Sequence, residues 1–227
     1  MSKKEIKDVV IFGTGRFAEI ISKYFQRYTD YKIIAYIDTL KDKKKIKQKE
    51  SLILSPEEFL NNFPPNSCKM FIAVGYREMN SIRSNLFLKY KKIGYSFVSF
   101  IHPNVEWWDN SIIGENSFIF ENNVIQQNVV IGNSVILWSG NHIGHHSSIL
   151  DNVWITSHVV VYSDVVIGKN CFIGSNTNIR DGISIGCHNF IGAGSNIWKS
   201  TEDYDVFSVN PSKPLGLKSD KISHLFF

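Results

Sequence analysis

The chain has 227 residues, enough for one large domain or two small ones. Its 43% hydrophobic and 20% charged content is that of a globular protein and excludes a disordered one. No apolar run is long enough to cross a membrane, and the N-terminus leads into a strand-like segment without a signal-peptide cleavage site. We therefore expect a cytoplasmic protein with no membrane partner.

The net charge of +4 comes from one segment, residues 41–50, which holds six lysines and two acids. A nucleic-acid-binding protein spreads its basic residues over a face, so we expect a solvated loop here and no nucleic-acid partner. Three cysteines without a CxxC pair, Cys68, Cys171 and Cys187, exclude a disulfide framework and a zinc-ribbon site. No metal site is expected.

Residues 1–100 alternate between strand-like and helix-like segments. Short apolar runs of the kind that parallel sheets bury are Asp8–Phe12, Lys32–Ile37, Met70–Val74 and Ser96–Phe100. Helical patterns cover Phe17–Arg27 and Glu78–Ile93, and Ser55-Pro56 marks another helix start. This order predicts an α/β, Rossmann-like domain of about half the usual size.

From residue 101 the pattern changes to a strict period of six. Fifteen consecutive sixth positions are aliphatic: Ile113, Ile119, Ile125, Ile131, Leu137, Ile143, Ile149, Ile155, Val161, Ile167, Ile173, Ile179, Ile185, Ile191 and Ile197. Glycine often follows the aliphatic residue, and a small or apolar residue recurs four places after it. This period fits neither a helix nor a single strand, but it is typical of the hexapeptide parallel β-helix.

Three faces of six residues make a coil of 18, so residues 101–200 form five coils of a β-helix domain. The ends of a solenoid must be covered. We expect residues 1–100 to cover one end and residues 201–227 to form a C-terminal cap on the other.

A glycine-turn domain fused to hexapeptide repeats resembles the NeuD/PglD family of sugar acyltransferases. The segments that carry the resemblance are IFGTGRFAEI, AYIDT, FIAVGYREMNSIR, LWSGNHIGHHSSI, VVIGKNCFIGSNTNI and VNPSKPLG. The stretch 138–161 is most similar to VioB-type N-acetyltransferases of nucleotide-linked 4-amino-4,6-dideoxy sugars. The resemblance implies a left-handed parallel β-helix, a homotrimer, and acetyl-CoA bound between neighbouring β-helices.

The implied activity is acetyl-CoA-dependent N-acetylation of a nucleotide-linked amino-deoxy sugar, such as dTDP-4-amino-4,6-dideoxyglucose, for surface-polysaccharide biosynthesis. Three alternatives stay open: a sugar O-acetyltransferase of the sialic-acid type, a γ-class carbonic anhydrase, and a non-enzymatic β-helix scaffold. The HxxHH cluster does not match the three zinc histidines of the carbonic anhydrases. A scaffold leaves this cluster and the GTG turn unexplained.

Acetyl transfer needs a base for the proton of the nucleophile, and an imidazole suits this task. The resemblance places His145 at the position of the family's catalytic histidine. The family member compared has a glutamate at the next position, where this chain has His146. We expect either that His145 uses another acceptor or that His146 relays the proton.

Steps of 18 residues from His145 reach Ser163, Asp181 and Lys199, which should stack along one corner of the β-helix. With adjacent coils ~4.8 Å apart, this row spans roughly 14 Å, about the reach of a pantetheine arm. We expect the acetyl-CoA thioester beside His145 and its phosphates near Lys199 and Lys213. Backbone amides around Ser163, Asp181 and Ala193 would hold the arm.

The turn after the first strand brings a helix N-terminus to a position where it can approach a phosphate. The turn lacks the third glycine of GxGxxG, so a dinucleotide is not expected. The resemblance assigns the nucleotide of the sugar substrate to Gly13, Thr14, Gly15, Arg16 and Asp38, with Gly75 and Arg77 closing the pocket. Phe17 stands where the family has a histidine.

Overall fold

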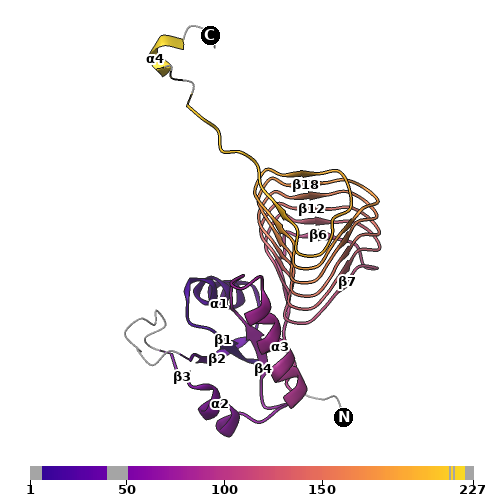
Figure 1. Cartoon of the computed structure of the whole chain (residues 1–227). Helices are drawn as coiled ribbons and strands as arrows, with labels where there is room; N and C mark the ends of the chain where they lie inside the picture. Colours follow the sequence, from indigo (N-terminus) through magenta and orange to yellow (C-terminus); the bar gives the residue numbers. More distant parts are fainter. Residues whose placement is uncertain (1–6, 40–50, 215, 217, 223–227) are drawn as a thin grey trace.

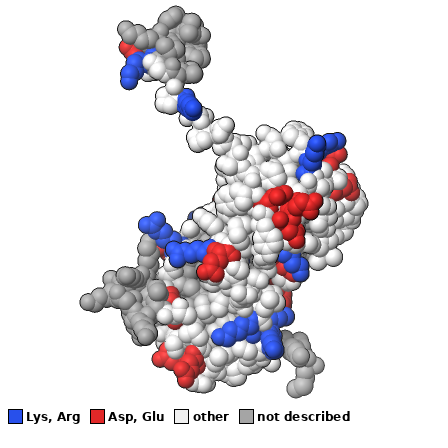
Figure 2. Space-filling view, in the orientation of Figure 1, with Lys and Arg blue, Asp and Glu red and all other residues white. Residues whose placement is uncertain are grey.

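The computed structural model describes residues 7–39, 51–214, 216 and 218–222 (Figure 1). The lysine-rich segment predicted as a solvated loop lies outside the described residues. In the described part, no helix is long and apolar enough to cross a membrane. On the face seen in Figure 2, the described lysines and arginines lie in separate small groups among acidic side chains.

The N-terminal part is a parallel sheet covered by helices on both faces. Its elements are β1 (Asp8–Phe12), α1 (Arg16–Tyr28), β2 (Lys32–Ile37), β3 (Ile53–Leu54), α2 (Pro56–Asn62), β4 (Lys69–Ile72) and α3 (Ser81–Ile93). The four strands lie in the order β3-β2-β1-β4, all parallel. Alternate residues of each strand therefore point to α1 on one face and to α2 and α3 on the other. The predicted alternation of buried strands and helices is confirmed.

The boundaries of α1 and β4 differ from the prediction by one or two residues, and two larger differences occur. Helix α3 begins at Ser81 and not at Glu78, because Glu78, Met79 and Asn80 have left-handed backbone angles with φ of 51°, 49° and 64°. The predicted strand 96–100 makes only one bridge to β4, at Phe97, and the chain then leaves the sheet. Helix α2 starts as expected, because Ser55 and Glu58 form a reciprocal capping box.

The C-terminal part is a parallel β-helix of two-residue strands on three faces (Figure 1). We name the faces and list their strands in order along the axis. The docking face holds β5 (Phe100–Ile101), β8 (Phe118–Ile119), β11 (Ile136–Leu137), β14 (Trp154–Ile155), β17 (Phe172–Ile173), β20 (Phe190–Ile191) and β22 (Val206–Phe207). The second face holds β6 (Glu106–Trp107), β9 (Val124–Ile125), β12 (His142–Ile143), β15 (Val160–Val161), β18 (Asn178–Ile179) and β21 (Asn196–Ile197). The third face holds β7 (Ile112–Ile113), β10 (Val130–Ile131), β13 (Ser148–Ile149), β16 (Val166–Ile167) and β19 (Ser184–Ile185).

The period-six prediction is confirmed by the core. All fifteen aliphatic positions point inward, and fourteen of them are buried, with Ile113 in the lowest coil partly so. The residues four places later, such as Val129 and Ser147, are buried as well. A Cβ on Gly144 would lie 2.6 Å from the Tyr162 carbonyl carbon of the next coil, so this glycine allows the coils to approach.

The corners show a second period of six that the aliphatic pattern did not reveal. The residue three places after each of the inward aliphatic residues from Ile113 to Ile191 has a left-handed backbone conformation, in which asparagine and glycine are tolerated best. We name the three corners by these residues. The seam corner holds Asn116, Ser134, Asn152, Asn170 and His188; the outer corner holds Asn122, Gly140, His158, Asn176 and Gly194; and the histidine corner holds Asn128, His146, Asp164 and Gly182.

The N-terminal domain packs along the docking face instead of covering an end of the β-helix (Figure 1). Ala18, Ile21 and Phe25 of α1 share one apolar cluster with outward residues of the docking face, among them Phe118 and Trp154. Aromatic side chains at the outward positions of this face give it an apolar surface, which explains why the domain lies there. At the other end, residues 201–207 close the last coil through β22, and residues 208–214 extend away from it. The short helix α4 (Ser219–Ile222) follows.

Candidate active site

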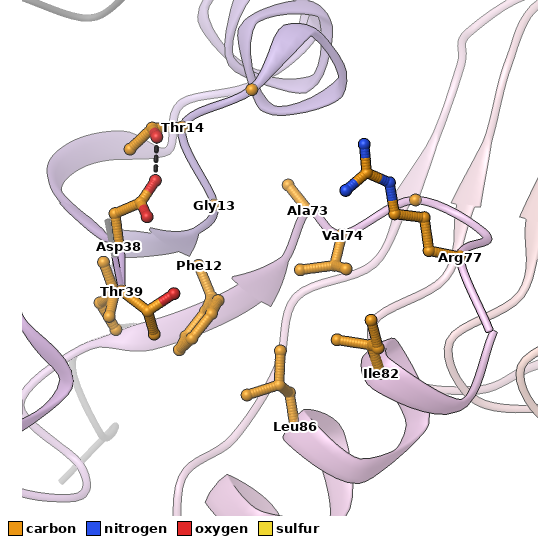
Figure 3. A pocket seen from close by; sticks show the side chains of 13 residues that line it. Phe12, Gly13, Thr14, Asp38, Thr39, Ala73, Val74, Arg77, Ile82 and Leu86 are labelled. Carbon is orange, nitrogen blue, oxygen red and sulfur yellow. Dashed lines mark hydrogen bonds between the residues drawn. The ribbon is translucent and has the colours of Figure 1, made fainter. Parts of the chain in front are cut away.

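A pocket of about 460 Å³ lies at the carboxyl ends of β1, β2 and β4 (Figure 3). Gly13 has φ of 115° there, and a Cβ would lie 2.8 Å from the Ala73 carbonyl oxygen, so this position needs glycine. The buried Thr14 hydroxyl group donates a hydrogen bond to the Asp38 carboxylate, which fixes this side chain at the pocket edge. Ligands of parallel α/β sheets bind at this edge.

The structure brings together six of the seven residues assigned to the nucleotide. The pocket is lined by Gly13, Thr14, Gly15, Asp38, Gly75 and Arg77. Arg16 is not among the lining residues, because it is the exposed first residue of α1. A Cβ on Gly15 or Gly75 would have no atom within 4 Å, so their small size leaves open space at the mouth.

Figure 3 shows Asp38 and Arg77 on opposite sides of the pocket. The lining between them is mostly apolar and includes Phe12, Val74 and Leu86. Helix α1 begins beside this lining without a side-chain cap on its N-terminus, so its first N–H groups are available to a ligand. The pocket thus combines an apolar lining, the Asp38 carboxylate as an acceptor for N–H or O–H groups, and Arg77 and the α1 N-terminus as donors for an anion.

Arg83 on α3 is a further residue at this site, which the sequence pattern did not single out. Its side chain is completely buried and contacts no carboxylate among the described residues. Its guanidinium donates to the backbone carbonyls of Asn152 (2.8 Å) and Ser134 (3.2 Å) on the seam corner, and to that of Gly75 (3.3 Å) in the pocket loop. Burial lowers the pKa of Arg83 to about 9, so it stays charged near neutral pH.

These contacts join the pocket to the β-helix. Asn80, fully buried and left-handed, accepts a hydrogen bond from Arg83 (2.9 Å) and donates to the carbonyls of Asn170 and Cys171 (3.1 Å each). The Ile72 backbone N–H donates to Asn116 on the same corner (2.7 Å). The seam corner therefore holds β4, the pocket loop and the start of α3 at four successive coils.

Phe17, where the family has a histidine, does not line the pocket. Its ring packs against Trp154 (5.0 Å between centroids) and Trp138 (6.4 Å) on the docking face. In this chain the position fastens the start of α1 to the β-helix.

His145 lies at the histidine corner, half-buried, beside a hollow of about 290 Å³ that Trp108, Gln126 and Gln127 also line. The His145 backbone N–H donates to the Gln126 side chain of the coil below (2.9 Å). The Nδ1 atoms of His145 and His146 are 3.0 Å apart, so one ring donates to the other. The two rings are therefore in direct contact, which a proton relay through His146 requires.

The row predicted to hold the coenzyme is brought together only in part. Backbone hydrogen bonds of 3.0 Å from Asp164 to His145 and from Gly182 to Ser163 stack the turns that contain His145, Ser163 and Asp181. Lys199 follows β21, where the last coil is shortened and Thr201 turns back to bond Ser184. Ala193 lies beside Gly194 at the outer corner, so within one chain it is not in the row. Lys213 is exposed on the segment that leaves the β-helix.

The other repeat histidines occupy different positions. His142 lies on the second face in β12, and His158 at the outer corner lies against Gly140 of the coil below. Within the part of the chain that the structure describes, no three His, Cys, Asp or Glu side chains form a group that could hold a metal ion.

Comparison with known families matches both halves of the chain. The family model of the PglD N-terminal domain matches residues 8–90, and that of the bacterial transferase hexapeptide (six repeats) matches residues 146–181. Both halves of the chain are thus similar to the NeuD/PglD-like family of sugar acyltransferases. No curated protein sequence matches the chain. In this NeuD/PglD-like chain, the pocket lies in the segment that the first model matches, and Ser163 and Asp181 lie in the segment that the second matches.

Solved structures share the fold over nearly the whole chain. The acetyltransferase domain of PglB from Neisseria gonorrhoeae, in complex with acetyl coenzyme A, has a TM-score of 0.80 at 22% identity, covering 93% of this chain and 100% of that one. PerB from Caulobacter crescentus, in complex with CoA and GDP-perosamine, has a TM-score of 0.77 at 20% identity, covering 89% and 94%. WeeI from Acinetobacter baumannii has a TM-score of 0.71 at 19% identity, covering 86% and 93%. Together with the hexapeptide repeats, these structures fit a left-handed β-helix.

Proposed function

We propose that this protein transfers the acetyl group of acetyl-CoA to the amino group of a nucleotide-linked amino-deoxy sugar, for which dTDP-4-amino-4,6-dideoxyglucose is our first candidate. The observation that carries the proposal is the presence of a nucleotide-sized pocket and a histidine-bearing β-helix corner in one NeuD/PglD-like chain. Residues 1–100 form the Rossmann-like domain for the nucleotide sugar, residues 101–200 the acyl-transfer domain, and residues 201–227 a C-terminal cap and tail.

The chemistry of the pocket supports the binding of the substrate's nucleotide there. Its apolar lining suits the faces of a base, and the Asp38 carboxylate can accept from a base imide or a ribose hydroxyl group. Arg77 and the N-terminus of α1 supply donors for the diphosphate. PerB, which shares the fold, was solved with GDP-perosamine.

His145 is the general base of the proposal. As the amine nitrogen attacks the thioester carbonyl carbon, its proton passes to the His145 imidazole, the C–S bond breaks, and the thiolate of CoA takes up the proton. The hollow beside His145 provides room for the reacting groups next to the imidazole. The stacked turns at Ser163 and Asp181 offer backbone groups to the pantetheine arm, and Lys199 and Lys213 offer cations to the phosphates.

The nucleotide pocket and His145 lie on different sides of one chain. The N-terminal domain packs on the docking face, whereas the histidine corner lies between the second and third faces, opposite the docking face. A substrate held in the pocket would therefore reach the His145 of a neighbouring chain more directly. This supports the homotrimer, in which acetyl-CoA lies between adjacent β-helices and Ala193 of one chain can join the row of another.

The test is a pair of measurements on the purified protein. Mass analysis after incubation with acetyl-CoA and dTDP-, UDP- or GDP-linked 4-amino sugars should show a gain of one acetyl group, and matched 4-hydroxy sugars should show none. His145→Ala should lower kcat by at least ~100-fold, the lower end of a general-base contribution. Acetylation of the hydroxy sugars alone would replace N-transfer with O-transfer, and an unchanged kcat in His145→Ala would refute the base assignment.

A further inference from the structure

A chain of four polar side chains ends at His145. Asn110 Nδ2 donates to Asn128 Oδ1 (2.5 Å), Asn128 Nδ2 lies 2.9 Å from His146 Nε2, and His146 Nδ1 lies 3.0 Å from His145 Nδ1. Asn110, Asn128 and His146 occupy successive coils of one corner, 18 residues apart. The hydrogen bonds therefore follow from the stacking of the coils.

The direction of these hydrogen bonds decides which nitrogen of His145 carries a proton. An amide NH₂ group can only donate, so His146 Nε2 must accept and the neutral His146 ring carries its proton on Nδ1. That proton is donated to His145 Nδ1, which leaves the proton of neutral His145 on Nε2. In this direction the outward nitrogen of His145 has no lone pair with which to act as a base.

The reverse direction gives a competent base. If both amide groups rotate by half a turn, Asn128 Oδ1 accepts from His146 Nε2–H, and His146 Nδ1 accepts from His145 Nδ1–H. His145 Nε2 is then free to take the proton of the amine. Asn110, Asn128 and His146 are exposed, so their side chains have room to rotate. The rotation of Asn110 gives up the hydrogen bond that the Asn128 backbone N–H donates to Asn110 Oδ1 (3.3 Å).

We propose that Asn128 is a positioning residue that selects the tautomer of His145 through His146. This inference rests on the proposed function of His145 as the base. Asn128 contacts only His146 and Asn110 in this chain of side chains, and it replaces the fixed acceptor that a carboxylate would provide. On the coil above, Asp164 holds the same corner position as His146, and the coil below presents Gln126 and Gln127 near His145.

Asn128→Asp tests the proposal, because a carboxylate can only accept. It forces the direction in which His145 carries its proton on Nδ1. The left-handed conformation is no obstacle, because Asp164 has the same conformation at the same corner (φ 59°). Asn122→Asp at the outer corner is the matched control, since it adds the same charge in the same conformation (φ 59°) away from His145.

The first readout is the ¹⁵N NMR spectrum of the imidazole nitrogens in the ligand-free protein, with the His145 signals assigned through His145→Gln. We expect the Nε2–H form, which must convert before His145 can act as the base, to dominate in the ligand-free native protein and in Asn122→Asp. The competent Nδ1–H form should dominate in Asn128→Asp. Asn128→Gly, which copies Gly182 of the same corner, should give a mixture of both. The same tautomer in Asn128→Asp as in the native protein would overturn the proposal.

The second readout is the pH profile of kcat/KM for the acetylated sugar. The half-maximal point of its acid limb should rise by on the order of half a pH unit in Asn128→Asp, because the carboxylate stabilises the protonated histidine pair. Asn122→Asp should leave the profile unchanged, and an equal shift in both variants would count against Asn128. If the native protein acetylates no sugar offered, the proposed function fails, whereas the NMR comparison still decides whether Asn128 sets the tautomer.

Discussion

At the scale of single residues, Tyr90 and Tyr95 form a natural comparison. Both side chains are buried, and their ring centroids lie 5.8 Å apart. The Tyr95 hydroxyl group donates to the Phe63 carbonyl, whereas the Tyr90 hydroxyl group has no hydrogen-bond partner among the described residues. A buried hydroxyl group without a partner costs stability, and a satisfied one contributes to it.

We therefore expect opposite effects from removing the two hydroxyl groups. Tyr90→Phe should leave the free energy of unfolding unchanged or raise it by up to about 1 kcal/mol, and Tyr95→Phe should lower it by about 1 kcal/mol or more. Urea unfolding of both variants at neutral pH measures the difference. Equal destabilisation by the two variants would mean that the Tyr90 hydroxyl group is hydrogen-bonded in solution.

At the scale of elements, the attachment of α1 to the β-helix depends on pH. The Tyr24 hydroxyl group on α1 donates to Glu121 beside the outer corner (2.9 Å). Burial, followed by this hydrogen bond, raises the pKa of Tyr24 to about 12. The folded state therefore holds this proton more tightly than the unfolded state, and the stability it gives is lost as the pH rises from about 10 to 12.

Tyr24→Phe should make the loss of stability above pH 10 smaller, while lowering the melting temperature at pH 8 because one interdomain hydrogen bond is missing. Thermal unfolding between pH 8 and 12 measures both effects. Other buried tyrosines, among them Tyr90, leave a residual loss in the variant. An identical pH dependence in the native protein and in Tyr24→Phe would show that α1 does not hold this proton.

The pocket loop offers a second test at this scale, because two arginines flank it with different tasks. Arg83 is buried and bonds the loop and the seam corner, whereas Arg77 is exposed and faces the pocket. Arg83→Met should lower the free energy of unfolding by about 3 kcal/mol, since several buried carbonyls lose their donor. Arg77→Met should change it by less than about 0.5 kcal/mol.

Titration with UDP, GDP and dTDP should show that Arg77 affects nucleotide binding directly and Arg83 only through the stability of the pocket loop. Arg77→Met should weaken the binding of the diphosphate without loss of stability. Arg83→Met should weaken it together with a loss of stability. A stable Arg83→Met protein with native affinity would mean that the seam corner does not position the pocket loop.

How much of these elements the sequence predicts depends on the range of the interactions. The inward ladder from Ile113 to Ile197 is a local repeat, and burial follows directly from it. The corner asparagines, such as Asn116 and Asn122, repeat with the same period and were a usable signal for the left-handed corners. Ala193 lies at another corner than His145, because its distance of 48 residues from His145 is not a multiple of the 18-residue coil.

No periodic pattern in the sequence indicated the contacts between the two domains. Arg83 lies in an ordinary amphipathic helix, and its partners Ser134 and Asn152 are 51 and 69 residues away. The docking face was visible only as outward aromatic residues, such as Phe118 and Trp154, whose position next to an inward isoleucine reads equally well as an exposed face. Which face the N-terminal domain covers is decided by shape and by the seam hydrogen bonds, and neither is periodic in the sequence.

At the scale of the whole molecule, the nucleotide pocket and His145 are separated within one chain. Complementation between two defective chains can therefore test whether they share a site. Asp38 lines the pocket of the N-terminal domain, which packs on the docking face, and His145 lies at the corner opposite that face. In a cyclic trimer, each proposed site would combine the pocket of one chain with the His145 of its neighbour. An Asp38→Ala chain and a His145→Ala chain would each be inactive alone, for different reasons.

Equal co-expression of these two variants with different tags, followed by purification through both tags, gives mixed trimers. If each site draws on two chains, every mixed trimer has one of its three sites with both an intact pocket and an intact histidine. Acetyl transfer should then recover to about a third of the native kcat, with a native KM for the nucleotide sugar, whereas the separately purified variants mixed without exchange should stay inactive. If pocket and histidine of the same chain serve one site, no mixture can restore activity, because every chain carries one defect.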